Sequence, residues 1–227
     1  MNIERVGVVG AGQMGSGIVE VSAKAGADVV VFEPTEELIA AGRNRVIQSL
    51  ERAASKGKLS ESDRDAALGR LTFTTSLADL SDRQLVIEAV VEDESVKGKI
   101  FAQLDELIAD PDAVLASNTS SIPIMKIAAA TKNPSRVLGL HFFNPVPVLP
   151  LVELISTLVT SDEAVARTED FAGSVLGKKV VRCGDRSGFI VNALLVPYLL
   201  SAIRMAEAGV ATVEDIDTAV VAGLSHP

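Results

Sequence analysis

The chain has 227 residues, of which 48% are hydrophobic and 22% charged, so it is long and apolar enough for a folded protein with a large core. Acidic residues number 30 and basic residues 21, and the net charge of −9 argues against nucleic acid as a partner. No apolar run reaches the roughly 18 residues of a membrane span, and no basic segment precedes an apolar one at the N-terminus. The single cysteine, Cys183, has no partner for a disulfide or a metal site and is expected to be a small apolar filler. We therefore expect a cytoplasmic protein without a structural metal and without a membrane partner.

Short apolar segments alternate with amphipathic ones over the first 141 residues. Strands are predicted at 6–9, 28–32, 71–74, 85–89, 113–116 and 137–141. Helices are predicted from the first glycine turn to Gly26, and at 95–109 and 124–130. The stretch 36–70, broken at Lys56-Gly57-Lys58, predicts two antiparallel helices inserted between strands. This order predicts an α/β fold with a Rossmann-like, doubly wound and mostly parallel sheet.

The pattern changes after residue 141. A proline-rich turn is predicted at 144–150, then a strand at 151–155, a helix at 162–176 and a strand at 179–182. The segment 184–188 predicts a hinge, followed by helices at 189–207 and 213–222, the second capped by Thr212 with Asp215. We expect a nucleotide-binding domain at 1–184 and the start of a helical substrate and dimerisation domain, here truncated, at 185–227.

A glycine-rich turn joins the first strand to the first helix. Gly10 permits the tight turn, Gly12 lets a pyrophosphate approach the backbone, and Gly15 lets helix and strand pack closely. Cofactor contacts are predicted for Gly10, Gly12, Gln13, Met14 and Gly15.

Glu33 ends the second strand, where a carboxylate can accept hydrogen bonds from the ribose 2′-hydroxyl and repels a 2′-phosphate. The sequence therefore predicts NAD as the cofactor. The alternative for Glu33 is a solvated carboxylate at a strand end.

His141 closes an apolar strand, so a group that exchanges a proton near neutral pH lies where catalytic groups gather in α/β enzymes. Glu153 interrupts the next apolar strand, where an unpaired carboxylate would be costly. If the proline turn folds this strand back, Glu153 can hold one imidazole nitrogen while the other acts on substrate. A structural histidine and an edge-strand glutamate remain the alternative on spacing alone.

Two further polar features interrupt apolar surroundings. Asn192 lies within an apolar helix and is expected to face a ligand, a domain interface or another helix. The run 117–121, Ser-Asn-Thr-Ser-Ser, follows a strand and either lines a site or forms a turn.

Together these segments resemble the NAD-dependent 3-hydroxyacyl-CoA dehydrogenases, including the 3-hydroxybutyryl-CoA dehydrogenases. The similar segments are 10–15, 86–89 with Glu92, 116–121, 139–145, 151–153, 188–192, 214–217 and 226–227. The resemblance implies a Rossmann-like domain followed by a helical domain used for dimerisation, and so a homodimer for the full-length protein. It implies the reversible oxidation of an L-3-hydroxyacyl-CoA to the 3-oxoacyl-CoA by NAD.

The resemblance also implies roles for individual residues. His141 would take the proton of the 3-hydroxyl while C3 passes hydride to the nicotinamide, and Glu153 would stabilise the imidazolium. Ser120 and Asn192 would donate hydrogen bonds around the substrate oxygen.

Other roles concern binding. Glu92, Lys97 and Asn144 would lie near the cofactor, and the substrate would meet Ser49, Lys56 and Ser120. From the residues alone, Lys56 and Lys97 are equally read as solvated charges of helices.

The chain departs from the family pattern at three positions. Glu33 replaces the usual Asp, Pro150 replaces a Lys, and Ala193 replaces an Arg. The family also continues past His226-Pro227 with further dimerisation helices and a cofactor-contacting lysine.

Two other functions compete with a dehydrogenase of short acyl-CoA thioesters in fatty-acid or butanoate metabolism. One is an NAD-dependent dehydrogenase of a free hydroxyacid or sugar acid. The other is a non-catalytic NAD-binding relative, against which the set Ser120, His141, Glu153 and Asn192 argues.

Overall fold

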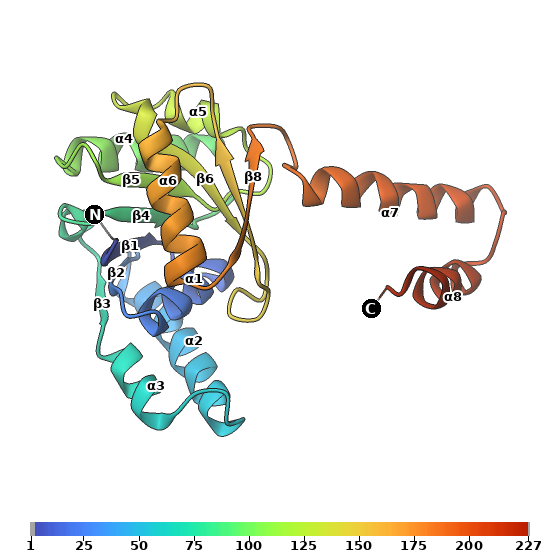
Figure 1. Cartoon of the computed structure of the whole chain (residues 1–227), viewed down its shortest axis with the longest axis horizontal. Coiled ribbons are helices and arrows are strands. Elements are labelled where there is room, and N and C mark those ends of the chain that lie inside the picture. The colour runs from blue at the N-terminus through green and yellow to red at the C-terminus, as the bar shows by residue number, and fades with distance from the viewer. Residues whose placement is uncertain (1–2, 227) are drawn as a thin grey trace. The chain divides into compact units, whose positions relative to one another are not determined.

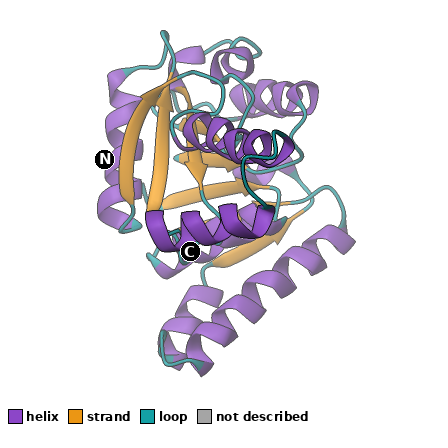
Figure 2. Cartoon of the chain, turned by 90° about the vertical axis from the view of Figure 1, so that its right-hand side faces the viewer, coloured by secondary structure: helices purple, strands orange, loops and turns teal. Residues whose placement is uncertain are grey.

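The computed structural model describes residues 3–226, which divide into two compact units between Ser187 and Gly188. The first unit carries a sheet with helices on both sides, and the second carries two helices (Figures 1 and 2).

In the described residues, eight strands form one sheet in the order β3-β2-β1-β4-β5-β6-β7-β8. The strands are β1 (Arg5–Val9), β2 (Asp28–Phe32), β3 (Leu71–Thr74), β4 (Leu85–Glu88), β5 (Val114–Ser117), β6 (Val137–Phe142), β7 (Leu151–Ser156) and β8 (Lys179–Gly184). All neighbours are parallel except β6 and β7, which are antiparallel. The predicted doubly wound, mostly parallel sheet is confirmed. The strand order reverses between β1 and β4, where folds of this class open a ligand crevice at the carboxyl ends of the strands.

The helices of the first unit connect these strands. They are α1 (Gln13–Lys24), α2 (Glu36–Ser55), α3 (Glu61–Leu68), α4 (Glu94–Leu107), α5 (Ile124–Ala128) and α6 (Asp162–Asp170). Single turns of 3₁₀ helix lie at Leu77–Leu80 and Pro134–Arg136, and a π-helical turn, Phe171–Val175, follows α6. The predicted helix at 162–176 is thus α-helical only to residue 170.

Helices α2 and α3 form the predicted inserted pair, drawn in light blue and teal in Figure 1. The hydroxyl of Thr35 caps α2 by accepting from the Leu38 amide, and Ser60 caps α3 by accepting from the Asp63 amide. Between them the chain turns at Gly57, whose φ of +67° favours glycine.

Successive side chains of each strand point to opposite faces of the sheet. On one face, Val8, Val31 and Leu140 belong to the main hydrophobic core together with residues of α1 and α6. On the other face Gly139 lies against α5, since a Cβ there would be 2.9 Å from Cδ1 of Ile124. Both faces are therefore covered, as the continuous apolar runs of the strands predict.

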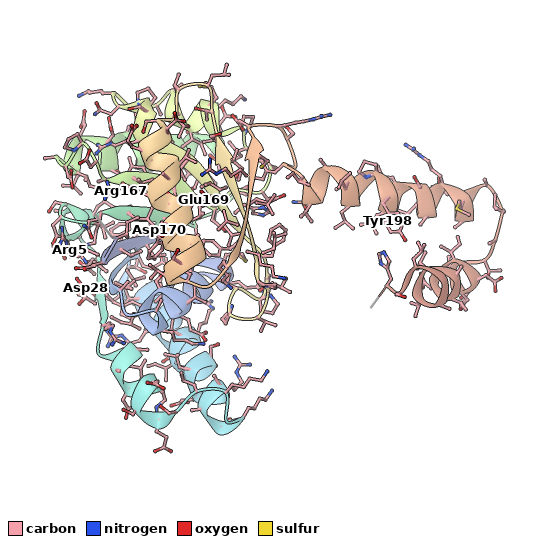
Figure 3. All side chains as sticks on the ribbon, viewed as in Figure 1. Arg5, Asp28, Arg167, Glu169, Asp170 and Tyr198 are labelled. Atoms are coloured by element: carbon pink, nitrogen blue, oxygen red, sulfur yellow. The ribbon has the colours of Figure 1, made fainter. Side chains whose placement is uncertain are left out.

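Charged residues lie at the amino ends of β1 and β2. Arg5 and Asp28, labelled in Figure 3, are register partners in β1 and β2. The buried guanidinium of Arg83 contacts Oδ2 of Asp28 at 2.7 Å.

The segment after β8 stays attached to the first unit. The strand runs through Gly184, and the carboxylate of Asp185 accepts hydrogen bonds from the Ile124 and Met125 amides at 2.9 and 2.8 Å. These contacts satisfy donors at the start of α5.

The second unit contains α7 (Val191–Glu207) and α8 (Val213–Leu224). The predicted cap of α8 is confirmed, because Thr212 Oγ1 accepts from the Asp215 amide and donates to its carboxylate. Tyr198, labelled in Figure 3, stacks on His226 with ring centroids 5.3 Å apart. Among the described residues, no helix is both long and apolar enough to cross a membrane.

Candidate active site

The carboxyl ends of β4, β5 and β6 carry polar side chains on one face of the sheet. In β6, Leu138 and Leu140 belong to the main core, so the alternation turns His141 to the face that α5 covers. Glu88 and Ser117 are register partners at the ends of β4 and β5, and Ser117 pairs with Gly139 of β6. One face therefore brings together groups that the sequence separates widely.

His141 and Glu153 face each other across the antiparallel pair β6–β7. The imidazole Nδ1 lies 2.8 Å from Oε2 of Glu153, and the two residues are 6% and 1% exposed. Because Glu153 engages Nδ1, Nε2 is the ring atom that can exchange a proton with a ligand. The ring of Phe143 tilts against the imidazole at 4.6 Å between centroids. The structure thus brings these two predicted residues together in a base and orienter arrangement.

Glu88 is a functional candidate that the sequence reasoning missed. Its buried carboxylate accepts hydrogen bonds from Lys97 Nζ at 2.6 Å, from Ser117 Oγ at 2.7 Å and from the Val90 amide at 2.7 Å. Lys97 is 1% exposed, so its interpretation as a solvated helix charge is wrong. The signal in the sequence is an acid at the end of an apolar strand, the same signal that singles out Glu33.

Glu92 accepts hydrogen bonds from the residues that follow β5. Its Oε1 accepts from the Thr119 hydroxyl at 2.6 Å and from the Ser120 and Ser121 amides at 3.0 and 3.2 Å. Partial burial alone would raise the pKa of Glu92, but these hydrogen bonds and the charge of Lys97 outweigh it and lower the pKa to about 2. Glu92 is therefore ionised at neutral pH and holds the backbone of Ser120 in place. The hydroxyl of Ser120 lies 3.4 Å from the same oxygen, a long contact.

Asn118 follows β5 and Asn144 follows β6. The side-chain oxygen of Asn118 accepts from the Phe142 amide at 2.9 Å and so ties the end of β5 to β6. Asn144 is exposed and is joined to Pro145 by a cis peptide bond. Lys178 donates to the carbonyls of Val146 and Leu149, which anchors the predicted proline turn. Burial and the charge of Lys24 lower the pKa of Lys178.

The glycine turn has the geometry that a dinucleotide needs. Gly10 has a φ of +95°, and a Cβ on Gly15 would lie 1.8 Å from the Gly10 carbonyl oxygen, so helix and turn are in direct contact. A Cβ on Gly12 would meet nothing within 4 Å, which leaves its outer side open to a ligand. Gln13 is exposed and Met14 partly buried in the first turn of α1. These residues fit a bound pyrophosphate at the start of α1.

Glu33 lies against this turn. Its Oε1 accepts from the Ala11 amide at 2.5 Å, and the residue is 8% exposed. The interpretation of Glu33 as a solvated strand-end carboxylate is therefore wrong. The Glu33 side chain reaches back to the turn.

The predicted coenzyme A contacts lie on α2. Ser49 is half-buried within the helix, and Lys56 is exposed at its C-terminal cap. Seven residues separate them, which is close to two helical turns, so they share one side of the helix.

Asn192 lies in the first turn of α7, in the second unit, and is half-buried there. Its role near the substrate oxygen stays a prediction.

Cys183 is half-buried in β8. Burial, with the charges of Glu153 and Asp185, raises the pKa of the thiol to about 11. The thiol is therefore protonated at neutral pH and a poor nucleophile, in line with its predicted role as a filler.

Two models of one protein family match almost the whole chain. Residues 5–186 match the family model described as 3-hydroxyacyl-CoA dehydrogenase, NAD binding domain, and residues 188–227 match the C-terminal domain of the same family. The chain belongs to the 3-hydroxyacyl-CoA dehydrogenase family. It is an oxidoreductase with the NAD-binding domain of that family, as the resemblance implied.

Several similar proteins are named for one member of this substrate class, 3-hydroxybutyryl-CoA. A 3-hydroxybutyryl-CoA dehydrogenase of Mycobacterium tuberculosis is 78% identical over 225 residues, which cover 99% of this chain and 79% of that protein. The crystal structure of FadB2 from M. tuberculosis matches with a TM-score of 0.98 at 78% identity, covering 100% of this chain and 80% of that one. The (S)-3-hydroxybutyryl-CoA dehydrogenase PaaH1 from Ralstonia eutropha matches with a TM-score of 0.96 at 41% identity, covering 100% and 79%.

Pro150 and Ala193, which we expect to differ from the family pattern, both take part in backbone hydrogen bonds. Pro150 lies in the exposed turn just before β7, and its carbonyl accepts from the Lys179 amide at 2.8 Å. Ala193 follows Asn192 in α7, and its amide donates to the Gly188 carbonyl.

Proposed function

We propose that this enzyme interconverts short-chain L-3-hydroxyacyl-CoA and 3-oxoacyl-CoA with NAD(H), with 3-hydroxybutyryl-CoA and acetoacetyl-CoA as the pair, in fatty-acid or butanoate metabolism. The observation that carries the proposal is the buried His141–Glu153 pair, 2.8 Å apart, on adjacent strands of a Rossmann-like sheet. The names of the similar dehydrogenases favour the four-carbon substrate.

His141 performs the proton transfer. In the oxidation direction its Nε2 takes the proton of the 3-hydroxyl, so that the oxygen can form the carbonyl as the C3–H electron pair leaves with the hydrogen. The nicotinamide ring, when bound, accepts that hydride. Glu153 accepts a hydrogen bond from Nδ1 of His141 and so keeps the imidazole ring oriented. Its negative charge stabilises the imidazolium that forms. In the reduction direction the imidazolium returns the proton to the oxygen.

Ser120 and Asn192 assist at the substrate oxygen. Their hydroxyl and amide groups donate hydrogen bonds that favour the more polarised oxygen of the transition state. The backbone of Ser120 is held by Glu92, whose carboxylate stays charged at neutral pH.

The chain's own groups also bind the cofactor and the thioester. The amides of the glycine turn and the start of α1 would hold the pyrophosphate, and Glu33 would hold the ribose. Glu92, Lys97 and Asn144 would lie near the cofactor, as the resemblance implies. Ser49 and Lys56 on α2 meet coenzyme A, where a lysine can pair with a phosphate group.

We propose that the protein acts in the cytoplasm as a homodimer. The basis is the single cysteine, together with the helical dimerisation domain that the resemblance implies.

A pH-rate profile of acetoacetyl-CoA reduction, with NADH and NADPH side by side, tests the proposal. We expect the rate of reduction with NADH to fall as the pH rises, because the protonated imidazole is the acid in this direction. The rate of oxidation of 3-hydroxybutyryl-CoA should rise with the same increase in pH. Rates that do not change with pH, or that change in the same sense in both directions, contradict His141 as the acid and base.

The competing functions give different results in the same assay. Turnover on acetoacetate as good as on acetoacetyl-CoA indicates a free-acid dehydrogenase, and NADH binding without turnover on either indicates a non-catalytic protein. Lys56→Ala should raise the KM for acetoacetyl-CoA and leave that for NADH unchanged. Lys58→Ala, at a nearby exposed lysine, is the matched control.

A further inference from the structure

Ala11, between the first two glycines of the turn, forms hydrogen bonds with two charged side chains. The Ala11 amide donates to Oε1 of Glu33 at 2.5 Å, and the Ala11 carbonyl accepts from Nη1 of Arg45 at 3.1 Å. One peptide segment of the dinucleotide turn thus places a carboxylate and a guanidinium next to the same residue.

Helix α2 brings Arg45 to this place by packing directly on the turn. A Cβ on Gly42 would lie 2.4 Å from the Ala11 methyl group, so only glycine permits the contact. Arg45 follows Gly42 by three residues and lies on the same side of the helix. Arg45 is an exposed residue, and its hydrogen bond to the Ala11 carbonyl holds the guanidinium beside the turn.

Most of the donors of Arg45 are unused within the described residues. A guanidinium carries five N–H groups, and Arg45 makes one hydrogen bond, to a carbonyl, with no carboxylate at ion-pair distance in the described part of the chain. Arg43, two residues earlier, differs because its guanidinium lies over the Phe73 ring, 4.8 Å from the centroid.

We propose that Arg45 is a latent ligand for the 2′-phosphate of NADP(H), and that the carboxylate of Glu33 alone keeps this group out. The inference rests on the proposed dinucleotide site. In such sites the acid at the end of the second strand meets the ribose 2′-hydroxyl, and a nearby arginine accommodates a 2′-phosphate. A phosphate beside Glu33 would meet a like charge, whereas without that charge it would find the guanidinium that already contacts Ala11.

The test measures binding of NADH and NADPH to the intact protein by nucleotide fluorescence, without turnover. The wild type should bind NADH and bind NADPH much more weakly. Glu33→Gln keeps an oxygen that can accept from the Ala11 amide but removes the charge, and should tighten NADPH binding by about tenfold or more. Because the new contact is ionic, that gain should shrink as salt concentration rises.

Two double variants assign the gain to one arginine. Glu33→Gln with Arg45→Met should lose the gain in NADPH affinity and keep NADH affinity near that of the single variant. Glu33→Gln with Arg43→Met should keep the gain. Thermal unfolding curves of the variants check that each is folded.

Three results would overturn the inference: no gain in Glu33→Gln, a gain that survives Arg45→Met, or a wild type that binds both nucleotides equally. A wild type that binds neither nucleotide instead contradicts the proposed function itself.

Discussion

Glu153 and Glu88 are both buried acids on the same face of the sheet, yet they hold different kinds of partner. Glu153 contacts an imidazole, which can gain and lose a proton, whereas Glu88 accepts from an ammonium, a hydroxyl and a backbone amide. A carboxylate beside a titratable ring stabilises a charge that forms during a reaction. A carboxylate beside permanent donors fixes their positions. The comparison therefore predicts a part in proton transfer for Glu153 and a positioning role for Glu88.

His141→Ala is the strongest test of this assignment. Turnover should fall by about 10³-fold, within the usual contribution of a general acid or base, while the dissociation constant of NADH stays unchanged. His226→Ala, at the chain's other histidine, is the control and should leave turnover near normal. A His141→Ala protein with near-normal turnover removes this residue from the mechanism.

Glu153→Gln should have a smaller effect of the same kind. The amide can still hydrogen-bond the ring, but it cannot stabilise the imidazolium, so we expect kcat to fall by about 10²-fold. The matched control is Glu163→Gln on α6, an exposed acid outside the site. If the variant loses stability but keeps the kcat of the wild type, Glu153 has a structural role and no role in proton transfer.

Glu88→Gln should act on stability before it acts on rate. It leaves the buried ammonium of Lys97 with Glu92 alone, 3.4 Å away, and breaking a buried pair costs about 3 kcal/mol of unfolding free energy. Chemical denaturation measures the loss, and adding Lys97→Met should recover part of it by removing the unpaired charge. No recovery in the double variant would mean that the pair is not the source of the loss.

Glu92→Gln should have the smallest effect, visible in the pH dependence of stability. The folded pKa of about 2 lies below the ordinary value of 4.5, so ionised Glu92 stabilises the fold above about pH 4.5, and this contribution disappears as the pH falls toward 2. The variant should therefore lose less melting temperature between pH 6 and pH 3 than the wild type does. Because Glu92 is partly exposed, solvent screening keeps the difference modest. Equal losses in both proteins would show that Glu92 is not strongly hydrogen-bonded in solution.

Local patterns were enough to predict most of the fold. The strand 28–32 and the helix break at Lys56-Gly57-Lys58 depend on apolar runs and on glycine, whose effects act within a few residues. The glycine turn was predictable for the same reason, because its backbone conformation depends on the glycines themselves. The boundary of α6 was not, since whether a helix ends as α or π is decided by the packing of its last turn.

By itself the sequence determined the elements, the dinucleotide turn and the candidacy of His141 and Glu153, since each follows from neighbouring residues or their spacing. Only the tertiary structure decided that β6 and β7 pair in the register that joins these two side chains, because a shift of one residue would send Glu153 to the other face. It also decided the contacts of Glu88 with Lys97, and of Arg45 with Ala11, which bring together residues 9 and 34 positions apart. Such contacts depend on where whole strands and helices pack, and no local pattern encodes that.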